Sequence, residues 1–600
     1  MAAIPGFEAV AIVGDEPTLV AQIASLFTRP NRYLTVLDGP RMSRSDWSNE
    51  VLRRSNALVM TRARQVILAN LPAETAKHLS KGWPDGSVIT VTSAEDAALA
   101  LMRRVKVPTE KMAWGSDNLG VGLMLARRAK KALHIADGPS PPTGFVPGGK
   151  QLLIVCEAGE QLAHIVASNL AFATGAAFLV IPRLPKDERD EWLEELYAIG
   201  SGGDVSARFE VIRDRARRVL PDFKFDTYKQ IMFATHGFPW GIAVPECATT
   251  HMYCYPDFGR STVVGIWASQ ESSRSARNAL LIHPKQVQGS EIESIAKSLS
   301  NNGTLVRIQA GPKATVHRIS TLVDTLPFDI MVLSTHAGDI PGERATYEFT
   351  DSDGLSRRLV IDHALVIGGY DPRSDKFLVH QFQRFHELDG VDWTNSEAKA
   401  QLPVGSAITS WLALGDLVER NKYKVESQII PRVIGSMGLQ MHNHVWMPIL
   451  HGFAPNCSPI VVNNACSSWH QLSLRFMFAR ARAYVGTLFP VTEVEAQEIG
   501  TTIFQEQLGA FLPTALWVSQ NSVYGTQNRR PYVMVGLPFC SVRSNRIDSI
   551  AYLANAYRNA IAEYAHKTET SPFADVRENS RQYKEFLSED FQTFSSKFKL

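Results

Sequence analysis

Apolar runs and helix-like repeats of apolar positions alternate along the first hundred residues. Strands are predicted at residues 7–13 and 33–37, with an amphipathic helix at 18–27 between them. The alternation continues with predicted strands at 56–60, 65–68 and 87–91 and a helix at 94–105. This order is typical of a parallel sheet covered by helices. The turn after the first strand has a single glycine, Gly14, and therefore lacks the spaced glycines of a dinucleotide-binding motif.

A basic segment and a linker end this region. The predicted helix at 123–134 carries four basic residues, Arg127, Arg128, Lys130 and Lys131. We interpret them as a solvated helix face rather than an anion or nucleic-acid site. Residues 137–149 are rich in proline and glycine, which indicates a linker and a domain boundary.

A unit of strands and helices occurs twice in the middle of the chain. In the first copy, the last strand (230–235) leads into His236 and Gly237. In the second copy, the last strand (329–335) leads into His336. The repeat predicts a duplicated α/β unit, and each copy places a histidine at the end of a strand.

The elements after His336 lead to a cysteine. A hairpin is predicted at 345–361 and a helix at 406–420, and a short buried strand at 459–463 leads into Cys466. Further elements are predicted as a helix at 471–481, a strand at 483–488, and helices at 494–508 and 550–565. The C-terminal residues lack a clear core face, so we expect a loosely attached helix or partial disorder there.

Composition and charge add mainly the classes of protein that they argue against. The 600 residues predict three or four domains, and the hydrophobic and charged fractions of 45% and 20% are those of a globular protein. A net charge of +2 indicates no general attraction to nucleic acid or membrane. No signal peptide or membrane-spanning run is recognised, and six scattered cysteines suggest free thiols in a reducing cytoplasm. We therefore expect a cytoplasmic protein.

Cys466 and His336 are the candidate reactive groups. Each follows an apolar strand, and in α/β sheets reactive groups collect at the carboxyl ends of strands. A thiol beside an imidazole is the pair that covalent acyl transfer requires. The sequence therefore predicts a Cys-His catalytic pair.

Four blocks in a fixed order resemble the CHAT peptidases, bacterial relatives of caspases and separase. The blocks are residues 311–315, 329–338, 463–468 and 484–496. The resemblance covers residues 278 to about 540. It implies a caspase-like mixed or parallel sheet flanked by helices in a C-terminal domain.

The element pattern, the linker and the resemblance together predict a domain plan. The expected parts are an N-terminal α/β (Rossmann-like) domain at 1–136, a linker at 137–149, a unit resembling an inactive peptidase half at 150–275, a peptidase domain at 276–545 with an insertion at about 370–450, and a helical tail at 546–600.

Roles follow from the same resemblance. Cys466 would be the nucleophile and His336 its proton-transfer partner. The backbone N–H groups of Cys466 and of Ala337 or Gly338 would form the oxyanion hole. The acidic residues after Pro490 and Val491, Glu493 and Glu495, would line a specificity pocket.

The expected partners are a protein substrate and an activating small molecule or protein that acts through the N-terminal half. No cofactor, metal or membrane is expected, and nucleic acid is not indicated. A role in bacterial antiviral defence is implied by the resemblance alone.

Alternative readings remain open. His236 is a rival histidine, but its unit offers only Cys247 and Cys254, and neither follows a clear strand in an Ala-Cys-Ser context. His442, His444 and His451, with Cys457 nearby, suggest a metal site without a complete ligand set. Asp362 and His363 are interpreted as part of a surface hairpin. An inactive caspase-like sensor or scaffold, and more weakly a metal-dependent hydrolase, are the competing functions.

Overall fold

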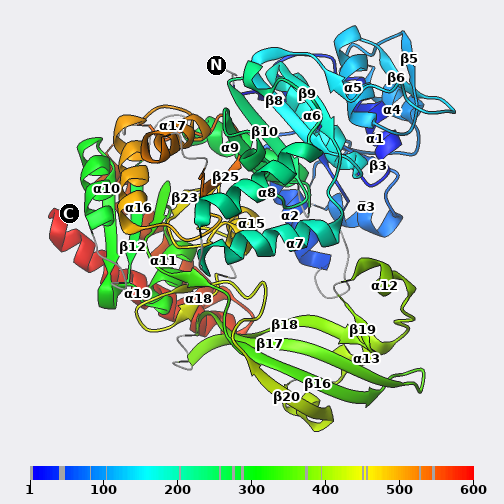
Figure 1. Cartoon of the computed structure of the whole chain (residues 1–600). Helices are drawn as coiled ribbons and strands as arrows, with labels where there is room; N and C mark the ends of the chain where they lie inside the picture. The colour runs from blue at the N-terminus through cyan, green and yellow to red at the C-terminus, as the bar shows by residue number, and fades with distance from the viewer. Residues whose placement is uncertain are drawn as a thin grey trace.

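The protein is a mixed α/β structure built around one large sheet (Figure 1). This computed structural model describes residues 4–39, 47–81, 83–102, 105–201, 204–255, 258–272, 277–284, 290–371, 376–393, 395–415, 417–448, 452–454, 457–525, 529–543 and 548–600. Within these ranges the large sheet has 11 strands, most of them parallel, with helices on both faces. The expected α/β class with parallel sheets and flanking helices is confirmed.

One half of the large sheet carries His336 and Cys466. Its strands lie side by side in the order β13 (Leu305–Ala310), β12 (Asn278–His283), β14 (Ile330–Leu333), β23 (Ile460–Asn463), β24 (Ala483–Thr487) and β25 (Tyr532–Gly536). Every residue of β14, β23 and β24 is buried. Strands covered on both faces read as continuous apolar runs, which explains why the sequence predicted them.

Helices cover both faces of this half. The apolar side chains of one face pack against α10 (Ser290–Asn301), α16 (Glu493–Thr501) and α17 (Leu512–Tyr524). Those of the other face pack against α11 (Val316–Thr325) and α15 (His470–Phe478). The carboxyl ends of β14 and β23 therefore emerge between two helical layers.

The other half continues the same sheet through β25. The order is β11 (Ala248–Tyr253), β10 (Gln230–Thr235), β8 (Gly149–Glu157), β9 (Ala176–Ile181) and β7 (Phe145–Val146). Its helices are α6 (Gln161–Thr174), α7 (Lys186–Ala198), α8 (Val205–Val219) and α9 (Phe258–Ser272). Strand β25 pairs with β24 on one side and with β11 on the other, so the two repeated units share one sheet.

The N-terminal region forms a separate small sheet. The order is β2 (Arg32–Leu37), β1 (Gly6–Gly14), β3 (Gln65–Ala69) and β4 (Val88–Val91), with helices α1 (Pro17–Ser25), α3 (Ala73–Leu79) and α4 (Ala94–Leu101). Strands β5 (Lys111–Trp114) and β6 (Ala132–Ile135) pair separately.

The predicted strand at 56–60 is wrong, because α2 (Trp47–Met60) occupies this segment. Arg54, Ala57, Leu58 and Thr61 are buried there, and this is the spacing of one helix face.

The predicted basic helix also needs correction. Helix α5 (Leu119–Ala129) ends before Lys130, whose φ of 56° stops the helix. Arg127 is buried rather than solvated, and its guanidinium donates to Phe27 O and to Asn169 Oδ1, both at 2.6 Å. This arginine joins the N-terminal domain to α6.

A second sheet is inserted between β14 and β23. Its strands are β15 (Ala337–Gly338), β16 (Gly342–Thr350), β17 (Ser356–Asp371), β18 (Lys376–Leu388), β19 (Val391–Asp392), β20 (Lys424–Ile430), β21 (Gly438–Gln440) and β22 (Val445–Trp446). The boundary predicted near residue 370 falls inside β17.

Three short helices accompany the second sheet, α12 (Ser396–Gln401), α13 (Ala407–Ala413) and α14 (Leu417–Arg420). The single helix predicted at 406–420 is two helices, separated by Gly415 with φ of 85°. Trp411 of α13 is fully buried against Tyr347 and Phe349 of β16.

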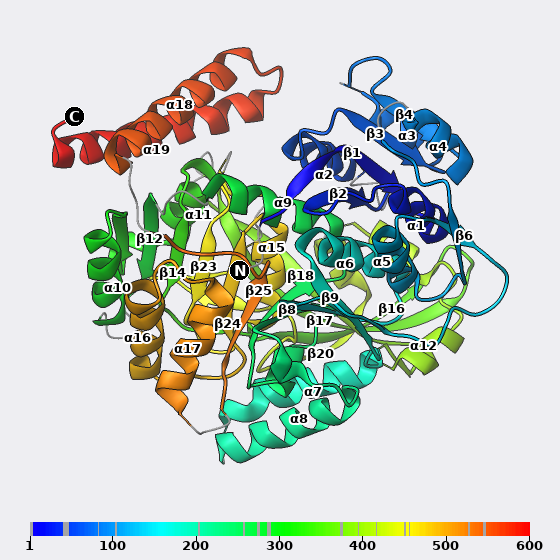
Figure 2. The same ribbon diagram turned by 90° about the horizontal axis from the view of Figure 1, so that it is seen from above.

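The C-terminal residues form a helical hairpin. Helices α18 (Ser549–Thr570) and α19 (Ala574–Phe598) lie side by side at the periphery (Figure 2). Asp590 of α19 accepts hydrogen bonds from Arg307 of β13 and from Arg318 of α11. None of the helices in the described part of the chain is long and apolar enough to cross a membrane.

Candidate active site

His336 and Cys466 lie beyond the ends of two neighbouring parallel strands. Leu333, the last residue of β14, pairs in register with Asn463, the last residue of β23. Each candidate residue is three positions beyond its member of this pair. Because adjacent strands are about 4.8 Å apart, the register brings both residues to the same place at the carboxyl edge of the sheet.

The turn that carries Cys466 is held by a buried hydrogen-bond network. Asn463 Nδ2 donates to the Tyr484 hydroxyl at 2.9 Å, and that hydroxyl donates to Ser468 O at 2.8 Å. Thr487 Oγ1 donates to Ala465 O, and Ser468 Oγ donates to Asn463 O. These bonds fix the backbone on both sides of the cysteine.

Ser467 completes this turn in an unusual backbone conformation. Its φ is 52°, a left-handed value that non-glycine residues rarely adopt. Such conformations persist where surrounding contacts hold them, and they cluster at functional sites. The chain therefore turns sharply directly after Cys466.

Cys466 differs from the other cysteines in exposure. Cys466 is partly exposed, whereas the other five cysteines are buried and none of the six forms a disulfide. Its Sγ lies 4.0 Å from the carbonyl oxygen of Val491, in the segment that leads into α16. A nucleophile needs access to its substrate, and among the cysteines Cys466 best meets this condition.

The backbone after His336 is fixed by the second sheet. The N–H of Gln440 donates to His336 O at 2.8 Å, and Ala337 and Gly338 of β15 pair with Leu439 and Gly438 of β21. The expected oxyanion-hole segment is therefore anchored to the insertion.

A buried carboxylate that sequence reasoning missed connects the two strands. Ser334 Oγ donates to Glu291 Oε2 at 2.7 Å, and Asn464 Nδ2 donates to Glu291 Oε1. Burial raises the pKa of Glu291, and the two hydrogen bonds oppose that rise. Glu291 was not detectable because it opens an ordinary amphipathic helix, α10, far away in sequence.

The two predicted specificity residues lie at the start of α16. Glu495 forms a capping box with Thr492 and lies 2.8 Å from Arg529. Its charge is thus already paired within the protein. Glu493 is exposed at the first position of the helix.

The first unit carries its own histidine and cysteine in the equivalent register. Thr235 of β10 pairs with Tyr253 of β11, and His236 and Cys254 are the next residue on each strand. Cys254 does follow a strand, β11, although its neighbours are Tyr253 and Tyr255 rather than Ala and Ser. Strand β11 was missed because Thr249, Thr250 and His251 interrupt its apolar pattern.

Hydrogen bonds explain how those polar residues fit into a covered strand. Thr250 Oγ1 donates to Gly536 O at 2.7 Å, and the His251 ring lies 3.0 Å from both Met534 O and the N–H of Gly241. Buried polar groups that are hydrogen-bonded in this way are tolerated inside a sheet.

The environment of this second pair differs from that of Cys466. Cys254 is buried. Burial is the main cause, and the contact with Cys156 the second, of a thiol pKa well above the usual range. Cys247 lies before β11, and burial raises the pKa of its thiol to about 12. Buried, protonated thiols are poor nucleophiles.

Glu157 holds the imidazole of His236. His236 Nδ1 lies 2.8 Å from Glu157 Oε2, and the other carboxylate oxygen accepts from Trp240 Nε1. Burial would lower the pKa of His236, but the hydrogen bond with Glu157 and the nearby Glu160 raise it to about 9.

The remaining histidine candidates were weighed as ligands of a metal site. In the described ranges there is no group of three His, Cys, Asp or Glu residues that could hold a metal ion. His442 and His444 lie within these ranges, and His451 lies outside them. Cys457 instead contacts Phe328, with its Sγ donating to Phe328 O at 3.0 Å.

The surface-hairpin interpretation of Asp362 and His363 is wrong. Both are buried: Asp362 accepts from Arg344, and the His363 ring lies 2.9 Å from the Tyr347 hydroxyl. Burial lowers the pKa of His363 to about 4. The pair is part of the core of the second sheet.

Comparison with known proteins assigns no family. No protein-family model and no curated protein matches the chain. Among solved structures, the chain is similar to Cwp6 from Clostridium difficile, with 10% sequence identity and a TM-score of 0.22 over 58% of this chain. The match spans 62% of that solved chain, less than two thirds of its length. A likeness this weak carries neither fold nor activity over to this protein.

Proposed function

We propose that the chain is a cysteine endopeptidase in which Cys466 is the nucleophile and His336 the proton-transfer partner. The observation that carries this proposal is the parallel register of Leu333 with Asn463, which brings the two residues to neighbouring strand ends. The partial exposure of Cys466 supports the same assignment.

The proposed reaction needs only these two side chains and backbone donors. His336 accepts the thiol proton, and the thiolate of Cys466 attacks the peptide carbonyl carbon. As the C–N bond breaks, the imidazolium gives its proton to the departing amine and a thioester remains. Water then attacks the thioester, His336 accepts the water proton and returns it to the sulfur, and the carboxylic acid product leaves.

Backbone N–H groups would stabilise the oxyanion of each tetrahedral intermediate. The candidates are the N–H groups of Cys466 and of Ala337 or Gly338. The hydrogen bonds to Asn463 O and Ala465 O and the pairing of β15 with β21 hold these segments in place.

The order of the elements supports a relation to the CHAT peptidases. A strand leads into His336, and a hairpin follows in β16 and β17. A second strand leads into Cys466, and then α15, β24 and α16 follow. This is the order in which the four sequence blocks resemble that family.

The first unit fits the role of an inactive counterpart. It repeats the histidine and the cysteine in register, but Cys254 is buried and its thiol has a raised pKa. We therefore assign catalysis to the second unit. Gating by a ligand or partner through the N-terminal half, and a role in antiviral defence, belong to the same proposal by resemblance.

Three single variants test the assignment. Cys466→Ala, His336→Ala and His236→Ala would be compared for cleavage of proteins encoded beside this chain, co-expressed with it, and for covalent capture of a peptidyl acyloxymethyl ketone. Loss of both signals in the first two variants and retention in the third is expected. Retained cleavage in Cys466→Ala would overturn the proposal. Absence of cleavage and capture in the unmodified protein would favour an inactive sensor or scaffold.

A further inference from the structure

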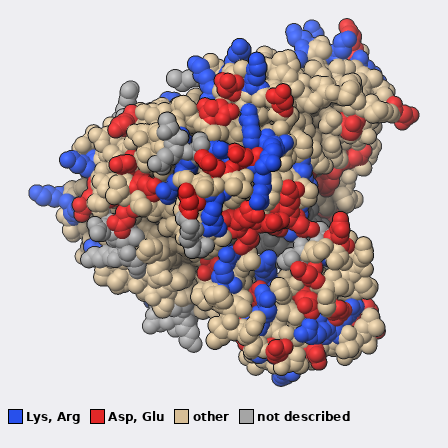
Figure 3. Space-filling model, viewed as in Figure 1, with Lys and Arg blue, Asp and Glu red and all other residues tan. Residues whose placement is uncertain are grey.

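A large cleft lies over the first unit rather than directly over Cys466. It has a volume of about 810 Å³, within the range of roughly 300–1,000 Å³ that is typical of ligand sites. Its walls are the N-terminal part of α7, the residues 382–385 of β18, and the start of α15, and His236 lies at its floor. Figure 3 shows acidic side chains gathered over α7, beside the hollow that separates this helix from the second sheet.

The wall formed by β18 is the edge of a strand and not one of its faces. Successive side chains of a strand point to opposite faces, but four consecutive residues of β18, from Phe382 to Phe385, line the cleft. On its inner side β18 pairs with β17, and β19 pairs only with Glu387 and Leu388. In the described part of the chain, the outer edge at 382–385 therefore carries no paired strand.

A free strand edge within a cleft fits an extended peptide. Main-chain hydrogen bonds to such an edge supply affinity, and flanking pockets select side chains. Aromatic residues provide these flanks: Phe385 packs on Trp393 with ring centroids 5.5 Å apart, and Tyr255 and Trp469 line other parts of the cleft.

His236 lines the floor of the cleft, but its Nε2 is buried. His236 is 6% exposed, and Glu157 binds its Nδ1. Its Nε2 lies 3.5 Å from Glu160 but makes no hydrogen bond with the described residues. The two glutamates raise the pKa of this imidazole to about 9 against the effect of burial, so His236 places a positive charge beneath the cleft rather than a donor that a peptide reaches.

The charges that line the cleft are mixed, with Lys186, Arg189, Arg384 and Lys399 beside Asp187, Asp190, Glu191 and Glu194. The α7 wall alone offers a place for one basic side chain. Asp190 is paired with Lys186 at 2.7 Å, and Glu194 is paired with Arg432 at 2.6 Å. Glu191, which is exposed on the same wall, adds negative charge without a paired cation at hydrogen-bond distance in the described ranges.

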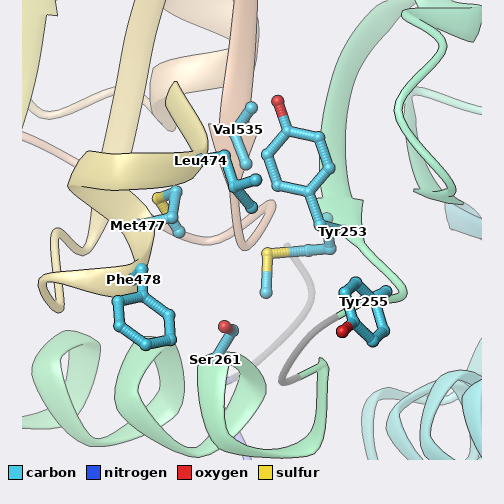
Figure 4. A pocket seen from close by; sticks show the side chains of 8 residues that line it. Tyr253, Tyr255, Ser261, Leu474, Met477, Phe478 and Val535 are labelled. Carbon is cyan, nitrogen blue, oxygen red and sulfur yellow. The ribbon is translucent and has the colours of Figure 1, made fainter. Parts of the chain in front are cut away.

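Two links connect the cleft with the elements of the proposed active site. On α7, Tyr197 accepts a hydrogen bond from the N–H of Asp339 at 3.0 Å, three residues beyond His336. Trp469, three residues beyond Cys466, lines the cleft. Figure 4 shows a small neighbouring pocket where Tyr253 faces Leu474 of α15, and the Tyr253 hydroxyl is hydrogen-bonded to Ser473.

We propose that this cleft is an exosite that binds an extended segment of the protein substrate with a Lys or Arg in it. The segment adds as a strand to the outer edge of β18, places a Lys or Arg against Glu191, and directs the adjoining chain along α7 toward Cys466. The inference rests on the proposed peptidase function, which supplies the reason for a peptide to be bound here.

Binding is tested on the full-length Cys466→Ala protein, so that turnover plays no part. Displayed random dodecapeptides would be selected on this protein, and the enriched peptides measured by fluorescence anisotropy. We expect strand-forming sequences that contain a Lys or Arg, and we expect their affinity to fall about tenfold or more in Glu191→Lys. Glu188→Lys is the matched control, because Glu188 is on the same helix but does not line the cleft. The Glu188→Lys protein should bind the same peptides with unchanged affinity.

Hydrogen exchange locates the bound peptide. Added peptide should slow the exchange of backbone amides in residues 382–385. The proposal is overturned if no peptide is enriched, if Glu188→Lys weakens binding as much as Glu191→Lys, or if protection appears elsewhere. Peptide binding as predicted, together with absence of cleavage by the protein with Cys466 intact, would refute the peptidase assignment and leave the peptide site standing.

Discussion

Ser334 Oγ donates a hydrogen bond of 2.7 Å to the buried carboxylate of Glu291. The other oxygen of that carboxylate accepts from Asn464 Nδ2. Ser334 and Asn464 each precede a candidate catalytic residue, His336 or Cys466, by two positions. One side chain from α10 therefore couples the two strand ends whose relative position the proposed chemistry requires.

Removal of the Glu291 carboxylate should slow the reaction of Cys466. In Glu291→Ala, both Ser334 and Asn464 lose a buried partner, and the two strand ends are no longer joined. We expect the rate of capture by a peptidyl acyloxymethyl ketone to fall on the order of 10- to 100-fold, as for other small displacements of reacting groups. Intact-protein mass spectrometry over time measures this rate.

Glu291→Gln distinguishes positioning from the need for a charge. The amide oxygen can accept from Ser334. The amide nitrogen can donate to Asn464 Oδ1 once the Asn464 amide turns over, because its Nδ2 now faces this position and its Oδ1 has no hydrogen-bond partner among the described residues. Glu291→Gln should therefore recover most of the capture rate that Glu291→Ala loses. Glu293→Ala, an exposed change in the same helical turn, is the control and should have no effect. Equal rates in Glu291→Ala and the unmodified protein would remove Glu291 from the site.

Cys466 should be the first cysteine to react with iodoacetamide. It is partly exposed, whereas Cys156, Cys254 and the remaining cysteines are buried. Peptide mapping after short exposure to the reagent should find the label on Cys466. His336→Ala should slow the labelling, because the Cys466 thiol then loses its proton acceptor. Earlier labelling of Cys254 would instead point to the first unit.

The turn around Cys466 should be sensitive to the loss of one hydroxyl. Tyr484→Phe leaves the Asn463 amide and Ser468 O without their shared partner in a fully buried site. The free energy of unfolding should fall by about 1–3 kcal/mol, measured by urea denaturation. Tyr524→Phe is the matched control, since the buried Tyr524 hydroxyl has no hydrogen-bond partner among the described residues. A loss of similar size in both variants would contradict the role of the network.

The sequence revealed the strands that are covered on both faces. The segments that became β10, β14 and β23 are short apolar runs, and burial on two faces requires that pattern. Because parallel strands present their carboxyl ends at one edge, His336 and Cys466 could be nominated from the residues that follow these runs.

Features that depend on contacts distant in sequence were not predictable. β11 is interrupted by polar residues whose partners belong to β25, and α2 was mistaken for a strand because its short apolar cluster fits both periods. Glu291 looks like a surface residue at a helix start until α10 packs against the ends of β14 and β23. Burial of His363 likewise depends on the pairing of β17 with β16 and β18.

The His236 site should make stability depend on pH. Its pKa is about 9 in the folded protein against 6.5 for the free side chain, because two glutamates outweigh burial. The folded state therefore binds more protons than the unfolded state between these values. The contribution is fully present below pH 6.5 and is lost as the pH rises through 9. The free energy of unfolding, measured by urea denaturation at several pH values, should fall less steeply with rising pH in His236→Gln than in the unmodified protein. Parallel curves for both proteins would contradict the raised pKa.

Asp590 should hold the C-terminal hairpin to the large sheet. Its carboxylate is 6% exposed and accepts from Arg307 and Arg318, each at 2.6 Å, and from the Tyr557 hydroxyl. Asp590→Ala leaves two arginines without their anion, and breaking a buried ion pair in this way costs about 3–5 kcal/mol. Limited trypsin digestion should therefore release residues 548–600 much faster from this variant. In Glu585→Ala, which removes an exposed pair with Arg581, digestion should be unchanged, since such pairs contribute about 0–1 kcal/mol. Equal digestion rates in the two variants would show that apolar contacts of the hairpin, rather than Asp590, hold it in place.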